Sequence, residues 1–154
     1  MTPIFKKLNL KDQQVIVIVQ APQSFEPELA ALEKVEVERD AEAVERIDFS
    51  LAFVTKQDEV DRLAAVIGQK AQGDATVWFA YPKGSSKRYT CEFNRDTGWG
   101  KLGEVGFEPV RQVAIDEDWS ALRFRRVEYI KRLTRKKLQA ISEEGKKRAG
   151  KDEA

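Results

Sequence analysis

The sequence predicts an α/β fold in which a mostly parallel sheet ends in an antiparallel hairpin and a basic helix follows at the C-terminus. Short runs of β-branched and aromatic residues alternate with segments of helical spacing through most of the chain. Two more strand-like runs then follow each other with only a short acidic connection between them. Alternating strands and helices imply parallel strands with helices on both faces of the sheet.

The first half of the chain contains three expected strands and one short helix. Residues 15–19 (VIVIV) are apolar on both faces, which is typical of a strand covered on both sides. Pro27 suits the first turn of a helix, and Leu29 begins its apolar stripe. Residues 35–39 (VEVER) alternate strictly and predict a half-exposed strand, whereas residues 49–54 (FSLAFV) predict another buried strand.

A longer helix and a fourth strand occupy the middle of the chain. The segment 55–58 (TKQD) resembles a capping box, and apolar residues at helical spacing continue from it to Gly68. Residues 75–81 (ATVWFAY) predict a strand that Pro82 stops. Residues 89–107 contain four glycines, which weaken a helix prediction, yet the order of elements requires a crossover element there.

The last third of the chain contains the expected hairpin and the basic segment. Residues 110–115 and 120–127 predict two strands joined by the acidic connection 116–119. We therefore assign residues 1–127 to one α/β domain. Residues 128–154 are assigned to a basic amphipathic helix with a frayed end, because apolar residues recur on one face and cations crowd the rest.

The formal net charge of +1 combines two blocks of opposite sign. Residues 1–122 carry 15 basic and 21 acidic residues, whereas residues 123–154 carry 12 basic and 5 acidic residues. We expect the basic segment either to contact nucleic acid or an acidic protein partner, or to dock on its own domain. Its candidate contact residues are Lys131, Arg132, Arg135, Lys136 and Lys137.

The residue types that the chain lacks narrow its chemistry. It contains no histidine, which excludes Ser-His-Asp and Cys-His triads and nearly every transition-metal site, so no metal site is expected. A single cysteine, Cys91, excludes an intramolecular disulfide. No apolar run approaches the ~20 residues of a membrane span. With one thiol and no signal segment, a cytoplasmic location is expected.

The loop after the strand at residues 75–81 is a candidate anion site. At the carboxyl end of a strand, cations, a glycine and hydroxyl groups suit a phosphate or a carboxylate. The candidate residues are Lys83, Gly84, Ser85, Ser86 and Lys87. An ordinary solvated loop is the alternative interpretation.

The turn after the first strand lacks the glycines that a nucleotide-type cofactor needs. Residues 20–25 (QAPQSF) contain no glycine, and Pro22 removes a backbone donor. Glu38 and Asp40 stand where an acidic residue would hold a ribose, but without the glycine turn they are interpreted as surface charges. We therefore expect no bound cofactor.

The acidic hairpin and one tryptophan complete the set of candidates. The carboxylates of residues 116–118 could bind a cation or act as acid and base, but adjacent residues of a tight turn point in different directions. The favoured interpretation is a charged turn with Trp119 folded onto the sheet. Trp99, which lies between two glycines, is expected to be the most exposed of the aromatic residues.

Two motifs stand out near the fourth strand and the hairpin. The first, W-x-A-x-P-K, consists of Trp78, Ala80, Pro82 and Lys83, and the second, D-x-x-W-S-x-L-R, consists of Asp116, Trp119, Ser120, Leu122 and Arg123. Both resemble motifs of a small uncharacterised bacterial family that is defined only as a domain of unknown function. The resemblance covers about residues 4–126. The resemblance implies a Rossmann-like (methyltransferase-like) fold without the cofactor glycines, and it implies no particular activity.

The resemblance adds Asp116, Trp119 and Arg123 to the candidate ligand-binding residues. The leading functional hypothesis is a non-enzymatic binding or regulatory module, because histidine and the glycine turn are both absent. Its sheet edge would bind a small anion or a partner. One alternative is a divergent transferase-type enzyme that uses Lys83 and the carboxylates of residues 116–118. The other is nucleic-acid binding through the basic tail.

Overall fold

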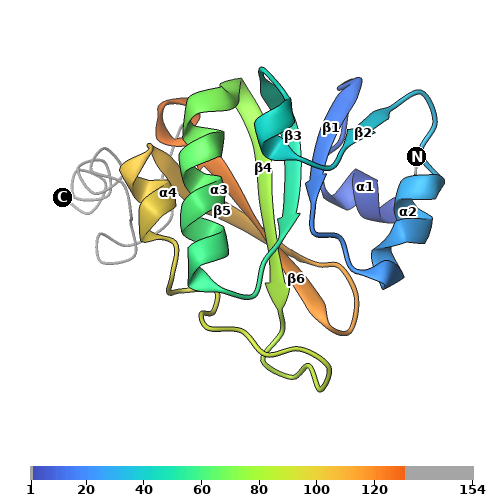
Figure 1. The fold of residues 1–154 in the computed structure, drawn as a ribbon, viewed down its shortest axis with the longest axis vertical. Coiled ribbons are helices and arrows are strands. Elements are labelled where there is room, and N and C mark those ends of the chain that lie inside the picture. The colour runs from blue at the N-terminus through green and yellow to red at the C-terminus, as the bar shows by residue number, and fades with distance from the viewer. Residues whose placement is uncertain (1, 131–154) are drawn as a thin grey trace.

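A computed structural model describes residues 2–130 of the chain, and six strands form its single sheet. The strands are β1 (Val15–Val19), β2 (Glu36–Glu38), β3 (Ile47–Phe53), β4 (Ala71–Pro82), β5 (Phe107–Ala114) and β6 (Trp119–Arg126). Their order is β2-β1-β3-β4-β6-β5 (Figure 1). The first four strands of that order are parallel, and β6 runs antiparallel to both β4 and β5. The expected α/β fold with a closing antiparallel hairpin is confirmed.

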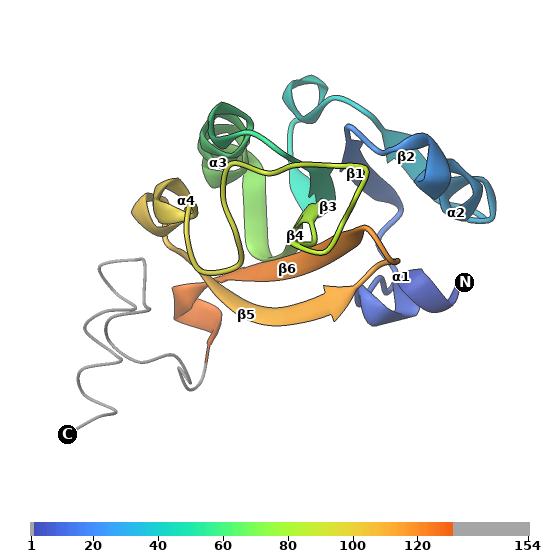
Figure 2. The same cartoon turned by 90° about the horizontal axis from the view of Figure 1, so that it is seen from below.

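Short helices cover both faces of this sheet. They are α1 (Pro3–Lys7), η1 (Gln23–Phe25), α2 (Glu26–Ala30), η2 (Ala41–Ala43), α3 (Gln57–Lys70), α4 (Gly100–Glu104) and η3 (Val127–Tyr129). Figure 2 shows α3 and α4 on one side of the sheet and α1 on the other, with α2 beside β2. The sequence analysis did not identify α1, which begins with Pro3 after the capping side chain of Thr2 and buries Phe5.

Alternation along the central strands divides the interior into two apolar cores. In β4, Trp78 packs in the core beneath α1 and α2, whereas its neighbour Phe79 packs in the core beneath α3 and α4. Both side chains are fully buried. Side chains alternate between the two faces of a strand, so a strand in the middle of such a sheet must be apolar on both sides. This is why the largely apolar runs within β1, β3 and β4 could be identified as strands in the sequence.

Helix α3 begins one residue later than the capping-box pattern suggested. Its N-cap is Lys56, and the carboxylate of Glu59 accepts hydrogen bonds from the backbone N–H groups of Thr55 (2.9 Å) and Lys56 (3.0 Å). The sequence had placed the reciprocal acid at Asp58, which is exposed. The helix then runs to Lys70, with Gly68 against Val105.

Residues 89–107 supply a loop and the short helix α4 rather than a long crossover helix. Trp99 is 2% exposed, so the expectation that it is the most exposed aromatic residue is wrong. Its ring packs against Phe79, Tyr81, Phe93 and Phe124 with centroid separations of 4.9–5.8 Å. The glycines on either side of Trp99 therefore do not indicate an exposed side chain, and Gly98 instead allows a backbone φ of 90°.

Part of the predicted basic helix lies outside the described residues. This applies to the candidate contact residues Lys131, Arg132, Arg135, Lys136 and Lys137. The described chain ends in the turn η3, directly after β6. None of the helices between residues 2 and 130 has the length and the apolar character that crossing a bilayer requires.

Candidate functional site at the carboxyl edge of the sheet

The strand order reverses between β1 and β3, and ligands of open α/β sheets bind outside the carboxyl ends of the strands at such a point. Here the first residue after β1 is Gln20, which has a positive φ of 58°. Its amide Nε2 donates to the carbonyl oxygen of Phe53 at 2.9 Å, so a side chain bridges the ends of β1 and β3. Glycine adopts a positive φ most easily, so Gln20 has the backbone conformation that a glycine would usually take at this turn.

The residues around this point do not fit the way in which Rossmann domains hold a nucleotide-type cofactor. Gln20 occupies the turn with a side chain, and Pro22 offers no N–H group. At the end of β2, Glu38 accepts from the N–H of Asp40, and Asp40 accepts from the N–H of Glu42. Both carboxylates are thus engaged by their own segment, and no step of a mechanism is assigned here to such a cofactor.

The loop after β4 lies across the carboxyl edge and is held there by hydrogen bonds to α3 and the end of β3 (Figure 2). The N–H of Glu92 donates to the carbonyl of Thr55 at 3.0 Å. The amide of Gln57 donates to the carbonyl of Gly98 at 2.7 Å and to Asp61 at 2.9 Å. These bonds fix the position of a segment that has no regular secondary structure of its own.

The start of this loop is tied to the β5–β6 hairpin. The N–H of Lys83 donates to the carbonyl of Asp118 at 2.7 Å, and the hydroxyl of Ser86 donates to the carboxylate of Asp118 at 2.9 Å. Asp116 closes the turn by accepting from the N–H groups of Asp118 and Trp119 at 2.8 and 2.9 Å. One hairpin carboxylate, that of Asp116, therefore stabilises the turn, and a second, that of Asp118, holds the loop after β4, which agrees with the interpretation as a charged turn.

Between this loop and the hairpin lies a wide-open cavity of about 350 Å³, lined mostly by polar and charged residues, which we call the edge pocket. It opens on the α3 side of the sheet, because Tyr81 belongs to the core beneath α3 and α4. Its lining residues are Tyr81, Lys83, Gly84, Asn94, Arg95, Asp96, Gln112 and Ser120.

Hydrogen-bond donors dominate the edge pocket. Gln112 Nε2 donates to the hydroxyl oxygen of Tyr81 at 2.9 Å, which leaves the tyrosine proton free to donate to a ligand. Burial raises the pKa of Tyr81 although Arg95 lowers it, so the hydroxyl keeps its proton at neutral pH. The ammonium of Lys83 makes no hydrogen bond or ion pair with the residues of the described range. Arg95 forms an exposed pair with Asp96 at 3.3 Å.

The structure brings together only part of the predicted site. Lys83 and Gly84 line the edge pocket, whereas Ser85 and Lys87 are exposed and do not line it. Ser86 stabilises the loop itself, because its hydroxyl also accepts hydrogen bonds from the N–H groups of Arg88 and Tyr89.

The residues highlighted by the second motif are dispersed. Asp116 closes the turn. Trp119 is buried against Phe53 and Tyr89, at centroid separations of 5.1 and 4.9 Å, in the core beneath α1 and α2. Arg123, the fifth residue of β6, pairs in register with Trp78 and does not line the pocket. Only Ser120 of this motif reaches the edge pocket.

The candidate site residues chosen from the sequence include only two of the eight residues that line the pocket, Lys83 and Gly84. Asn94, Arg95 and Asp96 come from the segment that carried no periodic pattern, and Gln112 comes from β5. One signal was available, because residues 94–97 (NRDT) are four polar residues directly before Gly98 and Trp99 within a crossover. The alternation of β5 also placed Gln112 on one face, but nothing in the sequence identified that face.

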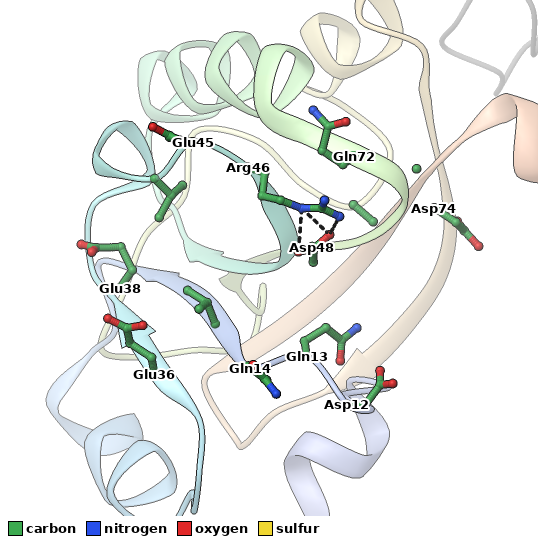
Figure 3. Close-up of a pocket in the computed structure, with 14 residues that line it drawn as sticks. Asp12, Gln13, Gln14, Glu36, Glu38, Glu45, Arg46, Asp48, Gln72 and Asp74 are labelled. Carbon is green, nitrogen blue, oxygen red and sulfur yellow. Dashed lines mark hydrogen bonds and ion pairs between the residues drawn. The ribbon is translucent and has the colours of Figure 1, made fainter.

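A second cavity, of about 880 Å³, lies at the opposite, amino edge of the sheet (Figure 3). Acidic side chains from several segments line it, among them Glu36 and Glu38 of β2. Figure 3 shows Arg46 turned toward Asp48, with which it forms an ion pair. Within residues 2–130 no group of three or more His, Cys, Asp or Glu side chains is arranged to hold a metal ion. This cavity lies away from the carboxyl edge, and acidic side chains line much of it, so it is a weaker candidate for an anion site than the edge pocket.

Comparisons with known proteins bear on the fold. No family model matches the chain, and no curated protein matches it either, so the motif resemblance to an uncharacterised family stays a prediction. A crystal structure of a SAM dependent methyltransferase from Aquifex aeolicus superposes with a TM-score of 0.58 at 14% identity, over 80% of this chain and 88% of that chain.

Two further structures are similar at lower scores. The Methanococcus jannaschii fibrillarin pre-rRNA processing protein gives a TM-score of 0.48 at 13% identity, over 75% of this chain and 67% of that chain. A putative type 11 methyltransferase from Sulfolobus solfataricus gives 0.46 at 7% identity, over 73% of this chain and 84% of that chain. Both of these TM-scores are below 0.5, so the two structures add no argument to that from the Aquifex aeolicus structure.

The methyltransferase-like Rossmann fold is thus shown, and the leading functional hypothesis needs correction. A non-enzymatic binding or regulatory module was expected because histidine and the glycine turn are absent. A solved structure that shares this fold with a TM-score above 0.5 is named a SAM dependent methyltransferase, and the non-enzymatic hypothesis is withdrawn in view of it. The absence of histidine removes several mechanisms, but group transfer can proceed through lysine, tyrosine and carboxylate side chains.

Proposed function

We propose that the chain is a divergent transferase-type enzyme on a methyltransferase-like fold, and that the edge pocket binds its anionic acceptor substrate. One observation carries the proposal: Lys83, Arg95 and the Tyr81 hydroxyl line one cavity of about 350 Å³ at the carboxyl edge of the sheet. Charged donors bind carboxylate or phosphate oxygens about twice as strongly as neutral donors do.

Each lining side chain has a role that its contacts allow. Lys83 supplies a charge that no described acid neutralises, and it is placed by the bond from its N–H to Asp118. Tyr81 donates its proton to a substrate oxygen, while Gln112 keeps the ring oxygen in position. Asp96 is the one carboxylate among the lining residues, and it would take the proton lost by an attacking hydroxyl or amine.

The transferase assignment is supported by the Aquifex aeolicus structure, which is named a SAM dependent methyltransferase. The W-x-A-x-P-K motif fits the same proposal, because its last residue, Lys83, lines the edge pocket. The turn after β1 does not fit the usual cofactor mode, so the test compares two chemical classes of donor.

The proposal is tested with the full chain, a panel of phosphate- and carboxylate-bearing small molecules, and two donors, S-adenosylmethionine and a nucleoside triphosphate. Anionic acceptors should raise the melting temperature saturably, and label should pass from one donor to the same acceptors. Lys83→Ala should weaken acceptor binding at least tenfold, because it removes a hydrogen bond to a charged group, worth roughly 1.5–3 kcal/mol.

Lys87→Ala is the matched control, since Lys87 belongs to the same loop but is exposed outside the pocket. It should leave acceptor binding unchanged. Equal losses in the two variants would show a non-specific charge effect, and the absence of both stabilisation and label transfer across the panel would refute the proposal.

A further inference from the structure

Two arginines lie directly opposite each other on the outer part of the sheet, on the face away from α3. Arg111 of β5 pairs in register with Arg123 of β6. Directly opposite residues of an antiparallel pair have Cβ atoms about 4.5–5.5 Å apart, and like charges in such positions are destabilising. In Figure 2 no described helix covers the middle of β5 and β6 on this side, because α1 lies beyond the end of β5.

Neither arginine has an acceptor within residues 2–130. Arg123 makes no hydrogen bond or ion pair there, and its Nε atom is buried without a partner. Arg111 is exposed and equally unpaired in that range. Burial, followed by the charge of Arg125, lowers the pKa of Arg123; Asp74 acts in the opposite direction and Arg111 adds to the lowering. The site therefore holds more positive charge than its own surroundings balance.

The acids of this face are already engaged. Both carboxylate oxygens of Asp74 accept from Arg125, at 2.8 and 2.6 Å. Glu108 pairs in register with Arg125, not with Arg123, and is fully buried. An external anion would therefore meet two guanidinium groups whose donors are not shared with a carboxylate.

We propose that Arg111 and Arg123 form a phosphate-binding site on the β5–β6 face. Two guanidinium groups offer planar sets of N–H donors that match the oxygens of a phosphate, and a phosphate carries up to two negative charges. The phosphate belongs either to a small phosphorylated ligand or to the backbone of a nucleic acid. The site is separate from the edge pocket, so it stands or falls independently of the transferase proposal.

The test is a titration of the full ¹⁵N-labelled chain with inorganic phosphate at constant ionic strength, followed by NMR. The backbone amides of Arg111 and Arg123 and the Arg123 Nε–H should shift saturably. Arg111→Gln and Arg123→Gln should each weaken phosphate binding at least tenfold. Arg62→Gln is the control, because Arg62 is exposed on α3 and its loss changes the net charge equally.

A second variant separates binding from folding. Arg111→Glu places a carboxylate opposite Arg123, so the melting temperature should rise while phosphate binding disappears. A single-stranded oligonucleotide of about ten nucleotides then distinguishes the sources. Binding that is tighter than that of phosphate and depends on both arginines identifies a nucleic-acid backbone. Phosphate binding without oligonucleotide binding identifies a small phosphorylated ligand.

Two results would overturn the site. One is the absence of a saturable shift with either probe. The other is a shift that Arg62→Gln reduces as much as Arg111→Gln does, because that would reflect net charge alone.

Discussion

Gly98 shows how a single residue holds the loop over the edge pocket. Its φ of +90° is one that side chains rarely adopt, and an added Cβ would lie 2.6 Å from Cβ of Phe93 and 2.7 Å from Oε1 of Gln57. Gly98→Ala should therefore lower the free energy of unfolding by roughly 2–4 kcal/mol, measured by urea denaturation. Gly100→Ala is the control, because nothing lies within 4 Å of its Cβ position, and its change should stay below about 1 kcal/mol. Equal losses would show that the close approach at Gly98 is not what constrains the loop.

The pocket residues differ in how far the sequence could identify them. Lys83 directly follows a strand with a clear pattern, so its place at the carboxyl edge could be predicted. Arg95 could not be placed, because long-range bonds such as that from Glu92 to Thr55 position its segment. Trp99 was misjudged for the same reason, since the rings that cover it come from β4, β6 and its own loop. Local residue types do not reveal such neighbours.

At the scale of the element, the start of α3 depends on one carboxylate. Burial raises the pKa of Glu59, but hydrogen bonds from the N–H groups of Thr55 and Lys56 lower it further, so it lies below the ordinary value of 4.5. A lowered folded pKa stabilises the protein above the unfolded pKa, and this contribution is lost as the pH falls through the folded pKa.

Glu59→Gln should therefore cost about 1 kcal/mol of unfolding free energy at pH 7, the usual value of a helix cap. The difference from the unmodified chain should shrink as the pH falls below 4.5. Glu117→Gln, at an exposed position in the hairpin, should change the unfolding free energy by less than about 0.5 kcal/mol at either pH. A loss for Glu59→Gln that is independent of pH would contradict the role of the carboxylate charge.

The elements themselves were predictable where burial imposes a pattern on the chain. The largely apolar runs of β1 and β3 and the periodic apolar residues of α3 predicted the type of each element, and its bounds to within a few residues. The beginning of β4 was set too late, because residues 71–74 pair across an irregular register and are largely exposed. Helix α1 is only five residues long, which is too short to show a helical period in the sequence. The burial of Phe5 stabilises it, and that contact is not visible in the sequence.

At the scale of the whole molecule, the two apolar cores share the central strands, and this should make unfolding cooperative. The core beneath α3 contains Trp99, and the core beneath α1 and α2 contains Trp119. Alternate residues of β4 and β6 belong to different cores, so neither core can lose its strands without exposing the other. The two faces should therefore unfold in one transition, as small single domains usually do.

Two single-tryptophan chains test this expectation. Trp78→Phe is common to both, so the loss of its hydrogen bond to Leu8, 2.7 Å long, cancels in the comparison. Trp119→Phe then leaves Trp99 as the reporter of one core, and Trp99→Phe leaves Trp119 as the reporter of the other. Ile67→Val, added on α3 to each chain, should lower the unfolding free energy by about 0.5–1.5 kcal/mol, and the fluorescence midpoints in urea should move equally for both reporters. A shift confined to the Trp99 reporter would show instead that the α3 side of the sheet unfolds as a separate unit.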